Sequence, residues 1–147
     1  KTINLHMVGK LQTNKVKIAL KVFDFIHSLD NIKLAKKISE EQKKYEKKVK
    51  LFIQVNLADE KQKSGVSYDK VRELLDYCNI NELNVIGLMC LPPFNEKSDK
   101  YFSKLMALNR TLNLKNLSMG MSNDYLTALE YNTTFLRIGS KIFGERN

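Results

Sequence analysis

Cysteine, proline and long apolar runs are scarce in this 147-residue chain, and each shortage narrows the class of protein. Its two cysteines, Cys78 and Cys90, are too few for a disulfide framework and form no Cys/His cluster suited to a metal. We expect both to be buried thiols in a reducing, cytoplasmic compartment. No run of about 18 apolar residues occurs, so we expect no membrane-spanning segment.

Glycine-rich phosphate-binding motifs are missing as well. No G-x-G-x-x-G and no P-loop follows the first apolar run, which argues against the nucleotide-binding version of an open α/β sheet. The two prolines, Pro92 and Pro93, stand together where an apolar run ends, and no linker or low-complexity tract divides the chain. We therefore expect one domain over residues 1–147.

Acidic residues are also scarce relative to basic ones. The sequence has 25 lysines and arginines and 16 aspartates and glutamates, for a net charge of +9. The excess gathers between residues 33 and 50, where eight lysines accompany three glutamates. Four apolar residues predict a helical stripe beneath these lysines: Leu34, Ile38, Tyr45 and Val49. Because no nucleic-acid-binding motif accompanies the lysines, we favour a solvated helix face and keep nucleic-acid or partner binding as an alternative.

Two hydrophobic periodicities alternate along the chain. Short apolar runs typical of buried strands cover residues 3–9, 25–29, 51–57, 85–91, 117–121 and 135–138. Segments with helical spacing separate these runs, most clearly at 71–78 and 102–112, and the capping residues Ser122 and Asn123 predict a further helix at 124–130. The alternation predicts an α/β protein with a parallel sheet covered by helices. Six units are too few for a closed eight-stranded barrel, which leaves an open doubly wound sheet or a barrel without its first two units.

The two histidines carry no recognisable motif. His6 and His27 lie near predicted strand ends, and the sequence shows no Ser/His/Asp or metal constellation around either. We expect structural hydrogen bonds from both rather than catalysis.

Two apolar runs near the C-terminal end finish in small, hydroxyl-bearing residues. Residues 117–122 read LSMGMS and residues 136–140 read LRIGS. Backbone N–H groups and hydroxyls at neighbouring strand ends bind anions, and phosphate sites in (β/α)₈ barrels frequently follow strands 7 and 8. The pattern predicts a phosphate pocket at this end of the sheet.

Six collinear motifs connect the chain to a known family. They are HMVGKLQTNK at 6–15, IHSLD at 26–30, IQVNL at 53–57 with Glu60 and KSG at 63–65, GLM at 87–89, LSMGMS at 117–122 and RIGSKIFGER at 137–146. The set resembles the pyridoxal phosphate homeostasis family (YggS-like, proline synthase co-transcribed). The resemblance implies a (β/α)₈ TIM barrel of the alanine racemase N-terminal type, here strands 3–8 only, without the first two β/α units.

The resemblance also implies which residues bind pyridoxal phosphate. Ser122 matches the family's phosphate-binding serine, and Gly139 with Ser140 matches the pair that completes the phosphate cup. Arg137 matches the arginine directed at the pyridine nitrogen, and Met89 matches a methionine that lines the ring. A guanidinium does not give up its proton, so the ring nitrogen would stay unprotonated and the ring would be a poorer electron sink. Two plainer roles remain open: Ser122 as a helix N-cap and Arg137 as a buried ion-pair partner.

For function, the resemblance implies a non-catalytic carrier or buffer of pyridoxal phosphate. The family's Schiff-base lysine lies on strand 1 and has no match in this chain. We therefore expect weak, non-covalent cofactor binding, with open sheet edges that make the polypeptide marginally soluble. The alternatives are a fragment of a racemase-like enzyme, for which no second general base is evident, and a basic nucleic-acid or partner-binding module.

Overall fold

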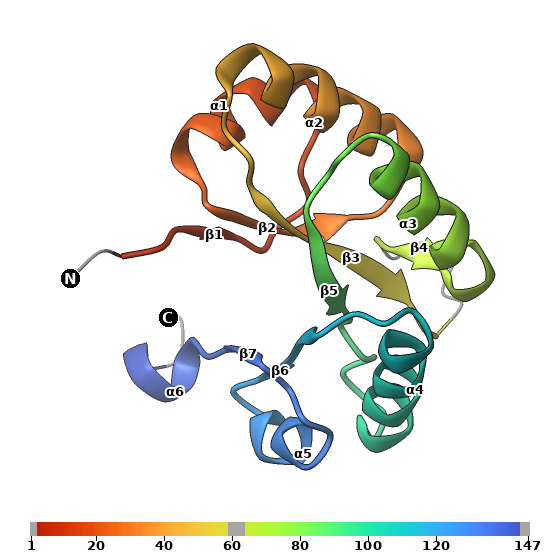
Figure 1. Ribbon diagram of the computed structural model, residues 1–147. Coiled ribbons are helices and arrows are strands. Elements are labelled where there is room, and N and C mark those ends of the chain that lie inside the picture. The colour runs from red at the N-terminus through yellow and green to blue at the C-terminus, as the bar shows by residue number, and fades with distance from the viewer. Residues whose placement is uncertain (1–2, 59–63, 145–147) are drawn as a thin grey trace.

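A curved parallel sheet organises the computed structural model, which describes residues 3–58 and 64–144 (Figure 1). In sheet order its strands are β1 (His6–Met7), β2 (Phe25–Leu29), β3 (Lys50–Asn56), β5 (Val85–Met89), β6 (Asn116–Met121) and β7 (Phe135–Arg137). Every neighbouring pair is parallel, and a short strand, β4 (Val66–Ser67), pairs with the end of β3. Strands β1 and β7 are therefore the edges of the sheet, as predicted.

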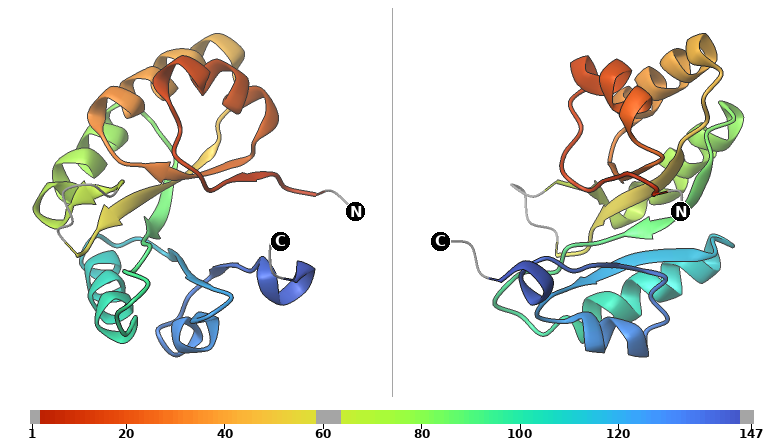
Figure 2. Two further views of the ribbon diagram at one scale, coloured as in Figure 1. Left: turned by 180° about the vertical axis from the view of Figure 1, so that it is seen from behind. Right: turned by 90° about the vertical axis from the view of Figure 1, so that its left-hand side faces the viewer.

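Helices cover the convex side of this sheet. They are α1 (Val16–Val22), α2 (Ile32–Tyr45), α3 (Val71–Ile80), α4 (Asp99–Thr111) and α5 (Tyr125–Glu130), with 3₁₀ turns η1 (Thr13–Lys15) and η2 (Tyr68–Lys70) before α1 and α3. A short helix, α6 (Ser140–Phe143), follows β7 and has no buried residue. The views in Figures 1 and 2 show an arc of strands with α1 to α5 outside it, and with β1 and α6 on the two sides of its opening. The α/β prediction is confirmed, and the partial barrel rather than the doubly wound sheet is the form adopted.

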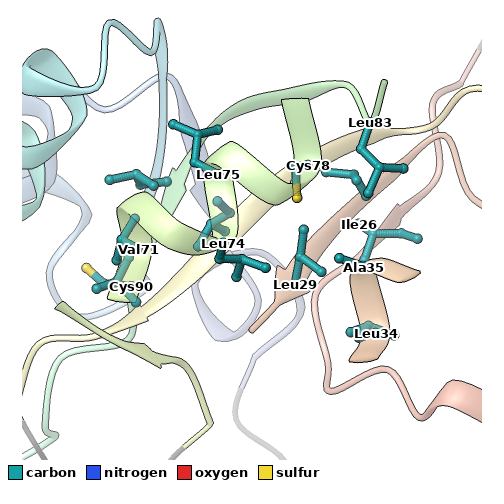
Figure 3. Packing of buried hydrophobic residues seen from close by; sticks show 14 of the residues in the cluster. Ile26, Leu29, Leu34, Ala35, Val71, Leu74, Leu75, Cys78, Leu83 and Cys90 are labelled. Atoms are coloured by element: carbon teal, nitrogen blue, oxygen red, sulfur yellow. The ribbon is translucent and has the colours of Figure 1, made fainter. Parts of the chain in front are cut away.

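Aliphatic side chains fill the layer between the helices and the convex face. Helix α3 contributes residues at helical spacing, and Leu74 and Cys78 from this helix belong to the same buried cluster as Leu29 of β2 (Figure 3). Helix α4 adds Phe102 and Leu105, both fully buried. The burial of this apolar surface away from water supplies most of the free energy that holds the helices on the sheet.

The concave face carries a second, aromatic cluster. Phe25, Phe52 and Met89 are buried there, with Ile86 and Phe135 packed against them. Successive residues of a strand point to opposite faces, so a central strand can contribute to both clusters. Phe52, for example, belongs to the concave cluster, whereas its neighbours in β3 belong to the convex one.

Several predicted boundaries shift. The 3–9 run pairs only at His6–Met7, because β1 is an edge strand held on one side by β2. Helix α2 ends at Tyr45, since Glu46 adopts a left-handed conformation (φ 50°). Val49 is therefore not part of the helical stripe; it is buried just before β3, and its N–H donates to the side chain of Gln42. The α1 and α6 helices and strand β4 escape the sequence pattern because they are short.

Within residues 3–58 and 64–144, no helix is both long and apolar enough to cross a membrane. Nor do His, Cys, Asp and Glu side chains in these ranges gather in groups of three or more that would suit a metal ion.

Candidate functional site

The predicted anion pocket forms where β6 and β7 end side by side. Met121 of β6 is in register with Arg137 of β7, so the residues that follow the two strands share one edge of the sheet. A cavity of about 700 Å³ opens there, a size typical of small-ligand sites. Its lining consists of Met121, Ser122, Asn123, Arg137, Gly139, Ser140, Phe143 and Gly144. Four of the five predicted site residues thus lie in one cavity, and their binding role stays a prediction.

The hydroxyl of Ser122 joins the two strand ends. Its Oγ accepts hydrogen bonds from the backbone N–H groups of Gly139 (3.2 Å) and Lys141 (3.3 Å). The alternative prediction, that Ser122 is the N-cap of α5, is wrong. Asp124 occupies the N-cap position, and its Oδ1 accepts a hydrogen bond from the N–H of Met121 (2.7 Å). The serine is therefore available for the cavity rather than for the helix.

Packing does not require a glycine at position 139. A Cβ placed on this residue meets nothing within 4 Å, whereas one on Gly120 comes within 2.6 Å of the Cβ of Ala128. Gly139 is one of the lining residues and the space beside it is open, so its backbone is accessible from the cavity. Among the residues that line the cavity, Arg137 is the charged one, so the lining favours an anion.

Arg137 is anchored by two of its three nitrogen atoms. Its Nη1 donates to the hydroxyl of Ser118 and its Nη2 donates to the carbonyl oxygen of Cys90, both at 2.8 Å. Among the described residues its buried Nε has no hydrogen-bond partner. The bonded acceptors are neutral, so Arg137 is not held by a hydrogen-bonded ion pair. Burial lowers the pKa of its guanidinium, and Cys90 and Asp124 oppose that shift.

A series of hydrogen-bonded polar side chains crosses the concave face, and both histidines belong to it, in line with the expectation that they make structural hydrogen bonds. Nδ1 of His6 lies 3.0 Å from Nε2 of His27, and Nδ1 of His27 lies 2.8 Å from Oγ of Ser118, which also contacts Arg137. Burial, followed by the charges of His6 and Arg137, lowers the pKa of His27 to about 4. The ring is therefore neutral near pH 7.

One part of this hydrogen-bonded series could be predicted from the sequence pattern, and another part could not. Strand alternation puts His27 on the same face as Phe25, so its inward direction follows from the pattern. The contact with Ser118, 91 residues away, does not follow, because β2 and β6 are not neighbours in the sheet. Only the curvature of the sheet brings these two strands' inward side chains together.

The remaining predicted residues have mixed outcomes. Met89 is fully buried against Phe25 and Phe52, away from the cavity lining, and its contact with a cofactor ring stays a prediction. Both cysteines are buried and unpaired, as predicted, and burial raises the pKa of the Cys90 thiol to about 12. Four motif residues fall outside the described ranges: Glu60, Lys63, Glu145 and Arg146.

The lysine-rich segment forms an ion-paired helix surface. Lys37 and Lys44 both contact Glu41, at 2.8 and 3.2 Å, and Lys47 lies 3.9 Å from Asp24. These bridges neutralise part of the local positive charge. They fit the solvated-face interpretation and leave the nucleic-acid alternative untested.

Comparisons with known proteins give the class first. Residues 2–147 match the family model of the alanine racemase N-terminal domain. A diaminopimelate decarboxylase from M. jannaschii superposes with a TM-score of 0.71 over 93% of this chain and 43% of its own, at 13% identity, and this likeness shows the fold alone.

Nearer relatives narrow the class. A pyridoxal phosphate homeostasis protein from Aquifex aeolicus is 39% identical over 96% of this chain and 66% of its own length. The structure of PipY from Synechococcus elongatus, with pyridoxal phosphate bound, superposes with a TM-score of 0.89 at 29% identity, over 98% of this chain and 72% of PipY. The chain belongs to the pyridoxal phosphate homeostasis protein family, and it spans about two thirds of the length of its curated relatives. The predicted family and partial barrel are thereby confirmed.

Proposed function

We propose that this chain, as a single partial-barrel domain, binds pyridoxal phosphate non-covalently through the phosphate and the ring nitrogen and acts as a carrier without turnover. The bound cofactor in PipY and the name of the Aquifex relative support the ligand. The geometry between β6 and β7 supports the mode of binding.

The phosphate would be held at the ends of β6 and β7. The N–H groups of Gly139 and Lys141 converge on one oxygen, Oγ of Ser122, and the same donors suit a phosphate oxygen. The hydroxyl of Ser140 lines the same cavity, and the open space beside Gly139 lets a ligand approach the backbone closely. Phosphate sites recur at this position in barrels of this kind.

The ring nitrogen would be held by Arg137, and this residue supplies the observation that carries the proposal. Its Nη1 and Nη2 are engaged by Ser118 and Cys90, while its buried Nε is left without an acceptor. A buried donor without a partner costs about 1–3 kcal/mol. Because this Nε is enclosed by protein, the guanidinium would have to shift to offer the N–H to an unprotonated pyridine nitrogen, and the new hydrogen bond would favour that shift. Arg137 borders the phosphate cavity, so one ligand can reach both groups.

The site suits retention of the cofactor better than turnover. Pyridoxal phosphate supplies an aldehyde and a ring that withdraws electrons when its nitrogen is protonated. Arg137 donates and does not release its proton, which keeps the ring nitrogen unprotonated and weakens that withdrawal. The Cys90 thiol, with a pKa raised to about 12, is not a competent acid or base near pH 7.

Calorimetry with two ligands tests the proposal. Pyridoxine 5′-phosphate has the ring and phosphate but no aldehyde, and inorganic phosphate has neither ring nor aldehyde. We expect Ser122→Ala to weaken both ligands by about tenfold. Arg137→Met should weaken pyridoxine phosphate by about tenfold more than inorganic phosphate, because inorganic phosphate loses only the attraction of the positive charge. Ser103→Ala and Arg110→Met, exposed on α4, are the matched controls. Wild-type protein that binds neither ligand would refute the proposal.

Borohydride treatment of the complex with pyridoxal phosphate tests the non-covalent mode. We expect no single lysine to be labelled stoichiometrically when the peptides are mapped by mass spectrometry. Stoichiometric labelling of one lysine would show covalent attachment and overturn that part of the proposal.

A further inference from the structure

The hydrogen bonds behind Arg137 have one direction in which the Ser118 hydroxyl proton also finds an acceptor, and this is the direction we infer. A guanidinium only donates, so Oγ of Ser118 accepts from Nη1 of Arg137. The proton of the Ser118 hydroxyl is then available to Nδ1 of His27 at 2.8 Å. A neutral His27 that accepts at Nδ1 carries its proton on Nε2, which donates to Nδ1 of His6 at 3.0 Å.

We propose that Ser118, His27 and His6 form a positioning relay that holds the Arg137 guanidinium toward the cofactor ring, and that proton uptake at His6 reverses the relay and loosens this hold. The inference rests on the proposed function, in which Arg137 binds the ring nitrogen of the cofactor. It extends that function by making the affinity for the ring depend on pH.

Stacking holds the relay in place. The ring of His27 stacks on Phe52, with centroids 4.4 Å apart and planes 16° apart, and the side chain is 2% exposed. The ring of His6 stacks on Phe25 at 4.1 Å and 11°. Ser118 is fully buried. Stacking on aromatic neighbours thus holds the planes of both imidazole rings, so that their nitrogens lie within hydrogen-bond distance of each other and of Ser118.

The reversal follows from counting protons. When the pair takes up one proton from solvent, His6 carries protons on both ring nitrogens and donates through Nδ1 to Nε2 of His27. His27 then carries its single proton on Nδ1 and donates to Ser118. The serine oxygen now receives two donors, from His27 and Arg137, and its own proton has no acceptor among the described residues. A buried hydroxyl proton without an acceptor destabilises this arrangement and favours a shift of the guanidinium.

The charged groups and the burial around the two histidines determine the pH at which the relay reverses. His6 is partly exposed; burial lowers its pKa, nearby Asp24 opposes the shift and Lys50 adds to it. His27 faces His6 and Arg137, and burial is the largest cause of its own lowered pKa. Proton uptake therefore belongs to His6, the member nearer to solvent, whose pKa is lowered from its ordinary value by burial.

Nuclear magnetic resonance tests the direction without any ligand. Long-range proton–nitrogen correlations in the labelled full chain report which nitrogen of each histidine is protonated. We expect His27 as the Nε2–H tautomer at pH 8 and as the Nδ1–H tautomer once His6 is charged. An Nδ1–H tautomer for His27 at pH 8, or charging of His27 before His6, would overturn the relay.

A pair of variants tests the positioning role. In His27→Asn the amide is placed to reach Ser118 but not His6, and in His27→Gln it is placed to reach His6 but not Ser118; both lose the same ring. We expect the glutamine variant to bind pyridoxine phosphate about tenfold more weakly than the asparagine variant, with equal binding of inorganic phosphate. Equal affinities for pyridoxine phosphate would refute the role, as would parallel losses for inorganic phosphate, which would indicate a merely structural effect.

The variant His6→Phe tests the pH dependence of binding. Its ring can still stack on Phe25, but it cannot take up a proton. At pH 7.5 and 5.0, the ratio of wild-type to variant affinity for pyridoxine phosphate cancels the ligand's own titration. We expect that ratio to fall at pH 5.0 for pyridoxine phosphate and to stay constant for inorganic phosphate. A constant ratio for both would overturn the pH dependence. Wild-type protein that binds neither ligand would instead sink the proposed function, and the tautomers would still decide the direction of the relay.

Discussion

The convex and concave faces of the sheet are made by the same strands but contain different chemistry. On the convex side, aliphatic residues from β2, β3, β5 and β6 meet helices α1 to α5 in one large cluster. On the concave side, three buried apolar residues share the space with two histidines, a serine and an arginine. The convex face serves stability, and we assign the concave face and its C-terminal edge to binding.

This contrast teaches how a partial barrel keeps an interior. The ring of His6 on edge strand β1 lies 5.8 Å from the ring of Phe135 on edge strand β7, so aromatic side chains meet across the arc. Polar groups are tolerated there because most of them are bonded to one another. The next four predictions test this division of labour, from the largest expected effect to the smallest.

Truncation in the convex layer should cost the most stability. Phe102 of α4 is fully buried, so Phe102→Ala should lower the free energy of unfolding by about 3–5 kcal/mol, measured by urea denaturation. If enough of the variant remains folded, its affinity for pyridoxine phosphate should equal that of the wild type. A specific loss of affinity in the folded fraction would contradict the separation of the two faces.

Acid should destabilise the concave face through His27. Its pKa is about 4 in the folded chain against 6.5 for the ordinary group, so the unfolded chain binds the extra proton first. Stability is therefore full above about pH 6.5 and falls as the pH drops toward 4, by on the order of 3 kcal/mol in all. Urea denaturation across this range measures it. His27→Gln should remove this part of the pH dependence, and an unchanged profile would show that another group is responsible.

The close contact between β6 and α5 gives a smaller effect. Gly120 has φ +92°, and an added Cβ would come within 2.6 Å of the Cβ of Ala128 and 2.8 Å of Cδ2 of Leu136. Gly120→Ala should therefore cost about 1–3 kcal/mol of unfolding free energy. Gly9→Ala is the matched control, since a Cβ there meets nothing within 4 Å. Equal stability of the two variants would show that β6 and α5 adjust freely.

The smallest effect should come from the lysine-rich surface of α2. Lys36 is exposed, and Lys36→Glu should change the unfolding free energy by less than about 0.5 kcal/mol. Binding of pyridoxine phosphate should also be unchanged. Salt-dependent binding of a nucleic acid that this variant weakens would instead support the basic-module alternative.

Much of the fold was predictable because its signals are local. The alternation of apolar runs and amphipathic segments identified the strands that carry the sheet and four of the helices that cover it, α2 to α5. Errors arose at edges and in short elements. β1 is shorter than its apolar run because one neighbour supports it, and α2 stops before Val49 because the chain turns at Glu46.

The sequence by itself determined the class of fold, the family and the cavity that Ser122 and Gly139 share, because each depends on short motifs at the ends of strands. The tertiary structure alone decided which side chains stand behind Arg137. Its contact with Ser118 and the link from there to His27 join strands that are not adjacent in the sheet. Such contacts depend on how strongly the sheet curves, and curvature results from the packing of all the strands and helices together rather than from any local pattern.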